Sequence, residues 1–251
     1  MIIESVDNKK IKYLKKLKDK KYRDEEKKFL IEGEHLVLEA NKSGLLEEVI
    51  LCNNEIDLDI DKVYVSENVM KTLSDLPSKV GIIGVCKIVD NKIDYSSNVL
   101  ILDGVQDPGN LGAIIRSAVA FNIKNIVLSK DTVDLYNTKV LRSSQGMNFH
   151  LNIVRDDITK VINELKNNDY VVYGTDVING IDVKSIKNDG KYAIIMGNEG
   201  NGISPGVKEL VDKNIYIKMN EKCESLNVAV SASIILYELE KRWSYEIYKY
   251  W

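Results

Sequence analysis

The second half of the chain contains an unbroken apolar run, Val-Leu-Ile-Leu, at residues 99–102, and Asp103 ends it. A run without polar interruption suits a strand that is buried on both faces, as in a parallel sheet. Three more strand-like stretches follow, at 125–128, 170–174 and 192–196. Helical patterns over 113–121 and 158–167 lie between them. Strands that alternate with helices predict an α/β fold with a largely parallel sheet.

The first half of the chain predicts a smaller α/β unit of its own. Its strand-like stretches lie at 29–33, 47–52, 62–65 and 81–89, and its helical patterns over 34–41 and 67–76. The stretch 90–98 is polar and has no periodic pattern, which is typical of a linker. We therefore predict an N-terminal domain over 1–92, a linker over 93–97 and a C-terminal domain over 98–251.

Length and composition exclude several classes of protein. A chain of 251 residues with 44% hydrophobic residues can bury a sizeable core. No apolar run is long enough to cross a bilayer and the first residues have no apolar secretion signal, which predicts a cytoplasmic protein. The three cysteines form no CxxC pair and only two histidines are present, His35 and His150. We therefore expect reduced thiols, no disulfide framework and no metal site.

Positive charge is concentrated near the N-terminus, although the net charge is −3 and the pI is about 5.6. Ile11, Leu14 and Leu17 recur at helical spacing, which predicts an amphipathic basic helix. The cations of this block are Lys9, Lys10, Lys12, Lys15, Lys16, Lys18, Lys20, Lys21, Arg23, Lys27 and Lys28. Such a block can bind the phosphate backbone of RNA, or it can be only the solvated face of a lysine-rich helix. The pattern alone leaves both interpretations open.

A glycine-containing stretch, Asp-Pro-Gly-Asn-Leu-Gly over 107–112, follows the first buried strand of the second half. Proline and glycine there predict a rigid loop at the carboxyl end of the strand, where open α/β sheets bind ligands. Asn110 is a candidate site residue or only a helix cap. Arg116, further along, could reach back to bind a phosphate, or it could form a surface salt bridge.

Two further stretches near the C-terminus are candidate parts of a ligand site, although the second, taken alone, favours a capped core helix. Gly197, Gly200 and Gly202 surround Glu199 after a buried strand, so backbone groups and one carboxylate would face the same space. A strand over 215–219 then leads through a polar loop to Ser225, which is a suitable N-cap for a helix that begins with small residues. Small residues there would let another backbone, a subunit or a flat ligand approach closely.

Together, three motifs resemble those of the SpoU (TrmH) family of S-adenosylmethionine-dependent RNA 2′-O-ribose methyltransferases, of the SPOUT class. The motifs read DPGNLGAIIRSA, MGNEGNGIS and IKMNEKCESLNVAVSASI and stand in the family's order. The stretch KYRDEEKKFLIEGEHLVLEA is similar to the opening of a ribosomal-protein-like RNA-binding domain. The resemblance implies a SPOUT domain with a deep C-terminal trefoil knot, a homodimer, S-adenosylmethionine as cofactor and no metal. It also puts Asn122 where the family commonly has glycine, which asparagine's tolerance of left-handed backbone permits.

The resemblance also implies two sets of site residues. The cofactor-binding set is Gly197, Asn198, Glu199, Gly200, Ile217, Met219, Leu226 and Asn227. The set placed around the reacting ribose, as catalytic residues, is Asn110, Arg116, Glu199, Ser225 and Asn227. A residue equivalent to Arg116 is often drawn as the base in this family, but a guanidinium group is effectively always protonated. We therefore interpret Arg116 as a phosphate anchor that also stabilises the developing alkoxide.

The resulting hypothesis is a methyltransferase that acts on a ribose 2′-hydroxyl in structured RNA and binds it through the basic N-terminal region. Large-subunit ribosomal RNA is the favoured substrate, and transfer RNA stays open as an alternative. A non-catalytic RNA-binding protein that kept the fold is a further alternative, which the presence of all the motif residues disfavours. Another nucleotide-binding α/β enzyme is disfavoured because no dinucleotide or P-loop motif is present.

Overall fold

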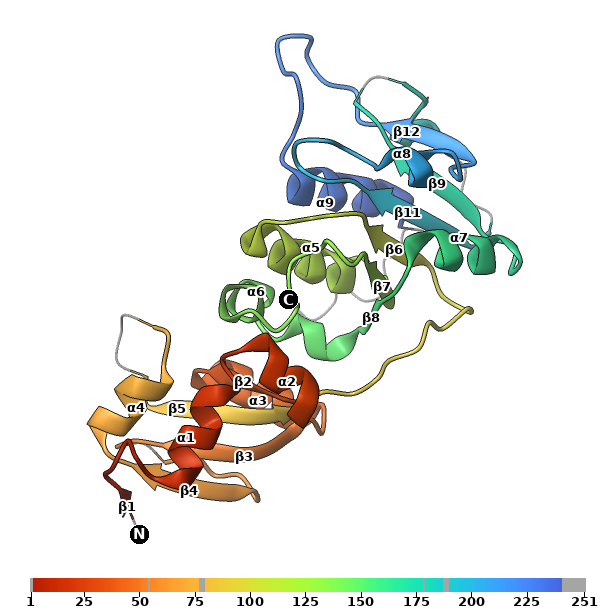
Figure 1. Ribbon diagram of the computed structural model, residues 1–251. Helices are drawn as coiled ribbons and strands as arrows, with labels where there is room; N and C mark the ends of the chain where they lie inside the picture. Colours follow the sequence, from red (N-terminus) through yellow and green to blue (C-terminus); the bar gives the residue numbers. More distant parts are fainter. Residues whose placement is uncertain (1, 54, 77–79, 178, 187–189, 241–251) are drawn as a thin grey trace, which may run out of the picture. The chain divides into compact units, whose positions relative to one another are not determined.

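The computed structural model describes residues 2–53, 55–76, 80–177, 179–186 and 190–240 of the chain (Figure 1). Its contacts divide the protein into two compact units. The first unit holds residues 1–90 and 134–150, and the second holds 91–133 and the residues from 151 onward. Residues 134–150, which we expect from the sequence in the second domain, therefore pack with the first.

The first unit is built on a mixed sheet of five strands. In spatial order these are β1 (Ile2–Ile3), β4 (Asp61–Val65), β3 (Leu46–Leu51), β5 (Ile82–Lys87) and β2 (Lys28–Glu32). The pairs β1–β4 and β4–β3 are parallel, whereas β5 runs antiparallel to both of its neighbours. The helices of this unit are α1 (Lys9–Lys16), α2 (Lys20–Glu26), α3 (Glu34–Lys42), α4 (Glu67–Leu73) and α6 (Thr138–Ser144), with a 3-10 turn at Met147–His150.

The predicted basic helix is present as two shorter helices, α1 and α2. Ile11, Leu14 and Leu17 are all buried, against α4, β3 and β5, so the predicted amphipathic face is confirmed. The helix breaks because Asp19 takes an extended conformation and its side chain accepts from the backbone N–H of Lys21, which caps α2.

Residues 134–150 pack against α2, α3 and β2 of the first unit. Asp134 pairs with Arg23, whose side chain is only 8% exposed. The ring centroids of Tyr136 and Phe29 lie 4.4 Å apart. Leu141 of α6 belongs to the apolar cluster under α3.

The second unit contains a sheet of seven strands whose neighbouring strands are all parallel (Figure 1). Their spatial order is β10 (Ile181–Asp182), β12 (Lys213–Tyr216), β9 (Val171–Thr175), β11 (Tyr192–Met196), β6 (Val99–Leu102), β7 (Asn125–Leu128) and β8 (Asn152–Arg155). The helices are α5 (Pro108–Ala120), α7 (Ile158–Lys166), α8 (Pro205–Lys208) and α9 (Val228–Leu239), with a 3-10 turn at Val183–Ser185. The predicted α/β class with a mainly parallel sheet is confirmed, while the knot stays a prediction.

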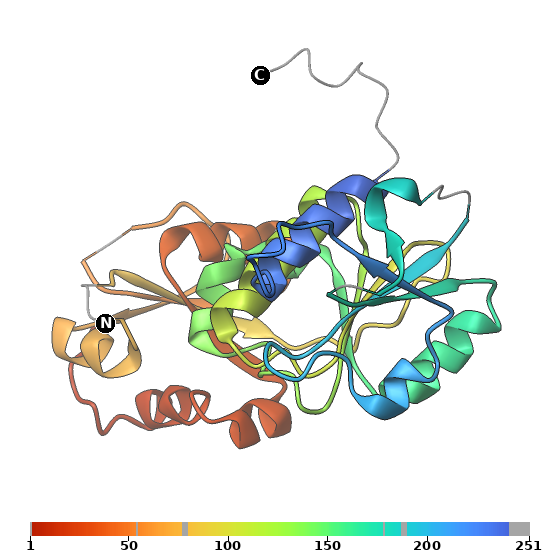
Figure 2. The ribbon, with the colours of Figure 1, turned by 90° about the horizontal axis from the view of Figure 1, so that it is seen from above.

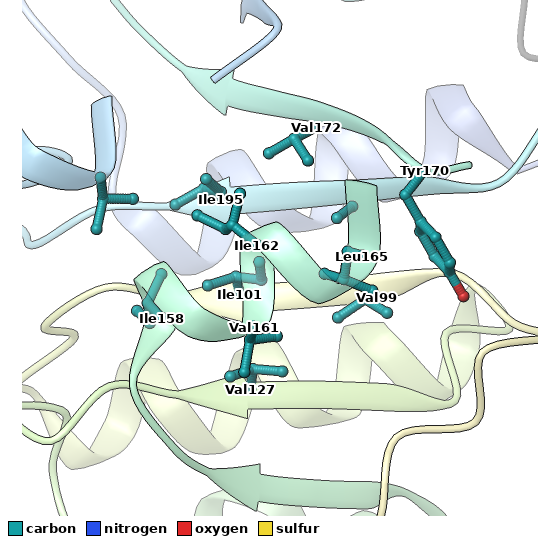
Figure 3. Packing of buried hydrophobic residues seen from close by; sticks show 12 residues of the cluster. Val99, Ile101, Val127, Ile158, Val161, Ile162, Leu165, Tyr170, Val172 and Ile195 are labelled. Atoms are coloured by element: carbon teal, nitrogen blue, oxygen red, sulfur yellow. The ribbon is translucent and has the colours of Figure 1, made fainter. Parts of the chain in front are cut away.

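Helices cover both faces of this sheet. Ile158, Ile162 and Leu165 of α7 are buried against β6, β9 and β11, as Figure 3 shows. On the opposite face α9 lies alongside α5 (Figure 2). Ala232 of α9 is buried, and Ser233 hydrogen-bonds to Ser117 of α5, with 2.7 Å between the hydroxyl oxygens. The small residues of α9 therefore permit close packing of the two helices.

Three local predictions were wrong. The stretch 107–112 is not a loop, because α5 begins at Pro108, with Asp107 as its N-cap. Proline is preorganised for the first helical position, where its missing N–H costs nothing. The strand predicted over 215–219 ends at Tyr216. Ser225 is not the N-cap of α9, since Asn227 accepts from the backbone N–H groups of Ala229 and Val230.

Other features agree with the sequence or add to it. Asn122 has φ of 58°, so the left-handed conformation expected there is confirmed. The strands β1, β8 and β10 and the helices α6 and α8 were not predicted. Of the helices in the described ranges, none is both long and apolar enough to cross a membrane.

Candidate functional site

A cavity of about 580 Å³ lies at the carboxyl ends of β9, β11 and β12 in the second unit. Ligands bind at this edge in open parallel sheets, because the loops that follow the strands meet there. Nine residues predicted from the sequence line the cavity: Gly197, Asn198, Glu199, Gly200, Ile217, Met219, Ser225, Leu226 and Asn227. The structure thus brings the predicted cofactor-binding set together around one space.

A hydrogen-bonded cluster joins the three motifs at the wall of this cavity. Glu199 accepts through Oε2 from the backbone N–H of Gln106 at 3.1 Å and through Oε1 from that of Asp107 at 3.1 Å. The Asn110 side chain also donates to Oε1, at 2.9 Å. Asn227 in turn donates through Nδ2 to Oδ1 of Asn110 at 2.9 Å. Asn110, Glu199 and Asn227, from three separate parts of the chain, therefore hold one another in place.

The hydrogen-bond donors around Glu199 determine the protonation state of its carboxyl group. Partial burial acts to raise the pKa of this carboxyl, but the donors from Asn110, Asp107 and Gln106 outweigh it and hold the pKa below its ordinary value. Glu199 is therefore ionised at neutral pH. A carboxylate whose oxygens already accept three hydrogen bonds is a weak base. The arrangement therefore suits Glu199 to hold its hydrogen-bond partners in position, not to remove a proton.

Asn198 shapes the loop that carries Glu199. Its Oδ1 accepts from the backbone N–H groups of Gly200 at 2.9 Å and Asn201 at 3.0 Å. Its Nδ2 donates to the carbonyl of Gly104 at 2.8 Å, and its backbone pairs with Gly202 in both directions. These bonds fold residues 197–202 into a tight turn beside the cavity.

The remaining predicted residues lie elsewhere. Arg116 is exposed on α5 and does not line the cavity; within the described part of the chain it has no recorded hydrogen bond or ion pair. Six residues of helix separate Arg116 from Asn110 by about 9 Å along the axis. The structure therefore does not bring Arg116 into the cluster. His35 contacts the carbonyl of Gln145 and His150 contacts Glu39, in the first unit.

Four further residues of the site were not predicted. Gln106 and Asp107 contribute backbone N–H groups, which carry no signal in the sequence. Asp176 and Lys208 line the cavity beyond β9 and in α8. The position of Asp176 directly after an apolar strand was the signal that could have found it. Among the described residues, no three His, Cys, Asp or Glu side chains gather as a metal site would require.

Each half of the chain matches a known protein family. Residues 97–237 match the SpoU rRNA Methylase family, and residues 8–84 match the MRM3-like substrate binding domain. The 23S rRNA (guanosine(2553)-2′-O)-methyltransferase RlmP of Bacillus subtilis is 40% identical over 243 residues. That match covers 94% of this chain and 98% of the relative.

Solved structures agree with the sequence comparison. An RNA 2′-O ribose methyltransferase superposes with a TM-score of 0.80 at 28% identity, covering 95% of this chain and 98% of that one. An AdoMet-bound rRNA methyltransferase from Sinorhizobium meliloti superposes with a TM-score of 0.85 at 25% identity. That match covers 95% of this chain and 97% of the other. With a family match over more than half of its residues and a relative 40% identical along most of its length, the chain belongs to the SpoU rRNA Methylase family.

Proposed function

We propose that this protein methylates a ribose 2′-hydroxyl in large-subunit ribosomal RNA, with S-adenosylmethionine as methyl donor. The observation that carries the proposal is the cluster of Asn110, Glu199 and Asn227 at the wall of the cavity. The name of the similar Bacillus subtilis protein, a 23S rRNA 2′-O-methyltransferase, supports the choice of substrate. Such a substrate would place the enzyme in the cytoplasm.

The cavity fits the cofactor in size and in character. Its volume of about 580 Å³ lies within the usual range for small-molecule sites. Ile217 and Leu226 offer apolar surface to a purine ring, and the backbone around Gly197 and Gly200 offers hydrogen-bonding groups. When bound, S-adenosylmethionine supplies an electrophilic methyl group on its sulfonium sulfur.

The cluster residues would orient the two reactants. A displacement at carbon needs the attacking oxygen in line with the leaving group, so a fixed arrangement of polar groups lowers the barrier. Asn227 lines the cavity and donates to Asn110, and ionised Glu199 holds Asn110 through Oε1. Ser225, at the cavity wall, can contact the ribose. Arg116, exposed on α5, would bind a phosphate of the RNA.

Substitution of Gly197 tests the cofactor site. A Cβ at this position would lie 2.2 Å from the backbone carbon of Gly202 and 2.3 Å from the nitrogen of Ile203. Gly197→Ala should therefore displace the turn, weaken S-adenosylhomocysteine binding at least about tenfold and lower the melting temperature by about 5 °C. The control is Gly206→Ala, where nothing lies within 4 Å of the added carbon. Wild-type affinity in Gly197→Ala would contradict this site, and calorimetry measures both variants.

The basic region of the first unit is the proposed RNA-binding surface, and we propose that its centre lies at Lys16 and Lys21. Lys10, Lys12, Lys18, Lys20, Lys27 and Lys28 form ion pairs with acidic side chains, and Arg23 is buried. Nζ of Lys16 and Nζ of Lys21 instead lie 5.3 and 5.9 Å from the ring centroid of Tyr22. An aromatic ring with two lysines near it suits a nucleotide, whose base can stack while its phosphates pair with the ammonium groups.

Charge reversal at this pair should weaken RNA binding. The double substitution of Lys16 and Lys21 by glutamate removes two phosphate contacts, so the slope of log K against log salt should become shallower by about 1.5. Affinity for S-adenosylhomocysteine should not change. Lys62 and Lys71, also exposed in this unit, provide a control with the same change in net charge. Equal RNA binding by the two double variants, measured by filter binding at several salt concentrations, would contradict the proposed surface.

A second copy of the chain would pack against α9. Val230 and Tyr237 are 47% and 64% exposed and, seven residues apart on a helix, share one face with the partly buried Ile234. Phe121, the C-cap residue of α5, extends this apolar surface, with its ring centroid 5.8 Å from that of Tyr237. Sedimentation equilibrium at micromolar concentration should give twice 28.4 kDa. A monomer would contradict the dimer.

Calorimetric titration with S-adenosylhomocysteine tests the proposed function first. Binding with one ligand per chain is expected. Absence of binding by folded protein would overturn the assignment of the cofactor, whatever the RNA substrate.

A further inference from the structure

Asp176 stands at the centre of the sheet edge that forms the cavity. It follows β9 directly, and its backbone N–H donates to the carbonyl of Ile215 in β12 at 2.9 Å. On the other side, Gly174 of β9 is in register with Ile195 of β11. Two residues further on, Asp176 therefore lies beside Gly197. It is flanked by the two strands whose following residues form the proposed cofactor site.

The carboxylate of Asp176 is held at the cavity wall. Its side chain is 15% exposed and lines the cavity. Oδ1 accepts from the backbone N–H of Asn179 at 3.3 Å, and Oδ2 lies 3.5 Å from Nζ of Lys208, which also lines the cavity. Lys208 and the backbone N–H of Asn179 thus both restrict the position of the carboxylate.

A fixed carboxylate at the end of a parallel strand matches one part of the cofactor. The ribose of an adenosyl group presents two neighbouring hydroxyls, which are both donors, and a carboxylate has two oxygens that accept. In dinucleotide-binding sheets an acidic residue takes this role at a comparable place in the sheet. Here no dinucleotide motif is present, but the sheet edge and the acid recur.

We propose that Asp176 binds the ribose hydroxyls of the adenosyl cofactor and that Lys208 positions its carboxylate. The inference rests on the proposed function, since it assigns a further residue to the same cavity. Asp176 is thereby a binding residue for the cofactor, whereas Lys208 acts through it.

Two ligands separate the ribose from the amino-acid end of the cofactor. S-adenosylhomocysteine has both, and 5′-methylthioadenosine keeps the ribose but lacks the amino-acid group. Asp176→Asn should weaken the binding of both ligands by the same factor, at least about tenfold, because a charge-assisted hydrogen bond to the diol is lost in each case. Asp176→Glu should weaken both equally as well, since it keeps the charge but moves the oxygens.

Asp212→Asn is the matched control, because Asp212 also pairs with a lysine, Lys166 at 2.7 Å, and accepts from the backbone N–H of Val172 at 2.9 Å. Asp212→Asn should bind S-adenosylhomocysteine and 5′-methylthioadenosine with the affinities of wild type. Weakening of S-adenosylhomocysteine alone would overturn the proposal in favour of contact with the amino group, and unchanged affinity for both ligands would overturn it outright. Wild type that binds neither ligand would instead refute the proposed function. Circular dichroism confirms folding, and if Asp176→Asn does not fold, Asp176→Glu decides.

Discussion

Glu199→Gln should lower the rate of methyl transfer about 100-fold. The carboxylate accepts from two backbone N–H groups and from Asn110, at 2.9 to 3.1 Å. A glutamine amide has one oxygen for these donors, and its NH₂ group would face at least one of them. Asn110 then loses its fixed orientation, and Asn227 loses it in turn through their mutual bond. Single-turnover methylation of an RNA fragment measures the effect on the chemical step.

Glu209→Gln provides the control for that experiment. Glu209 is an exposed glutamate of the same unit, at the end of α8, and does not line the cavity. Its substitution should leave the rate unchanged. A rate within about threefold of wild type in Glu199→Gln would show that the cluster does not position the reactants. The pKa of Glu199 lies below its ordinary value, so in wild type the cluster should persist at neutral pH and be lost only on acidification.

Arg116→Ala should lower the rate by about 100-fold, because the ribose loses the phosphate contact that would position it for attack. Arg116→Lys should be faster than Arg116→Ala but slower than wild type. Lysine keeps the charge but lacks the planar fork that binds a phosphate through two donors. Neither change should alter the affinity for S-adenosylhomocysteine, since Arg116 does not line the cavity. Rate and affinity thus separate a role toward the RNA from a role toward the cofactor.

Activity of Arg116→Lys close to wild type would contradict any role that needs the guanidinium fork. Weakened cofactor binding would contradict the placement of Arg116 outside the cavity. A rate that depends on pH in the same way in wild type and Arg116→Lys would argue against Arg116 as the base, because lysine titrates in a lower pH range than arginine.

The parts of the fold that the sequence predicted are those fixed by their own composition. The stretches 125–128 and 192–196 coincide with β7 and β11, since runs that are apolar on both faces have few alternatives to a central strand. The helix over 158–167 ends within one residue of α7, whose apolar stripe is buried. The glycine loop at 197–202 was recognisable from three closely spaced glycines after a buried strand, and the structure leaves no room for a side chain at Gly197.

The parts that the sequence did not predict depend on contacts between distant residues. Ser225 and Asn227 are both suitable caps by type, and the start of α9 at Val228 makes Asn227 the cap. The seven-residue helix α6 is too short to be stable alone and is held by packing in the first unit. The acceptor role of Glu199 toward Gln106 could not be predicted, because a backbone N–H is present at nearly every position.

The most direct test of the account is the site of methyl transfer. Purified protein is incubated with labelled S-adenosylmethionine and with total RNA from a strain that lacks the gene. The account predicts label in large-subunit ribosomal RNA, at a single ribose whose 2′-O-methyl group makes the adjacent phosphodiester resistant to alkali. Label in transfer RNA alone, label on a base, or no transfer by protein that binds S-adenosylhomocysteine would contradict it.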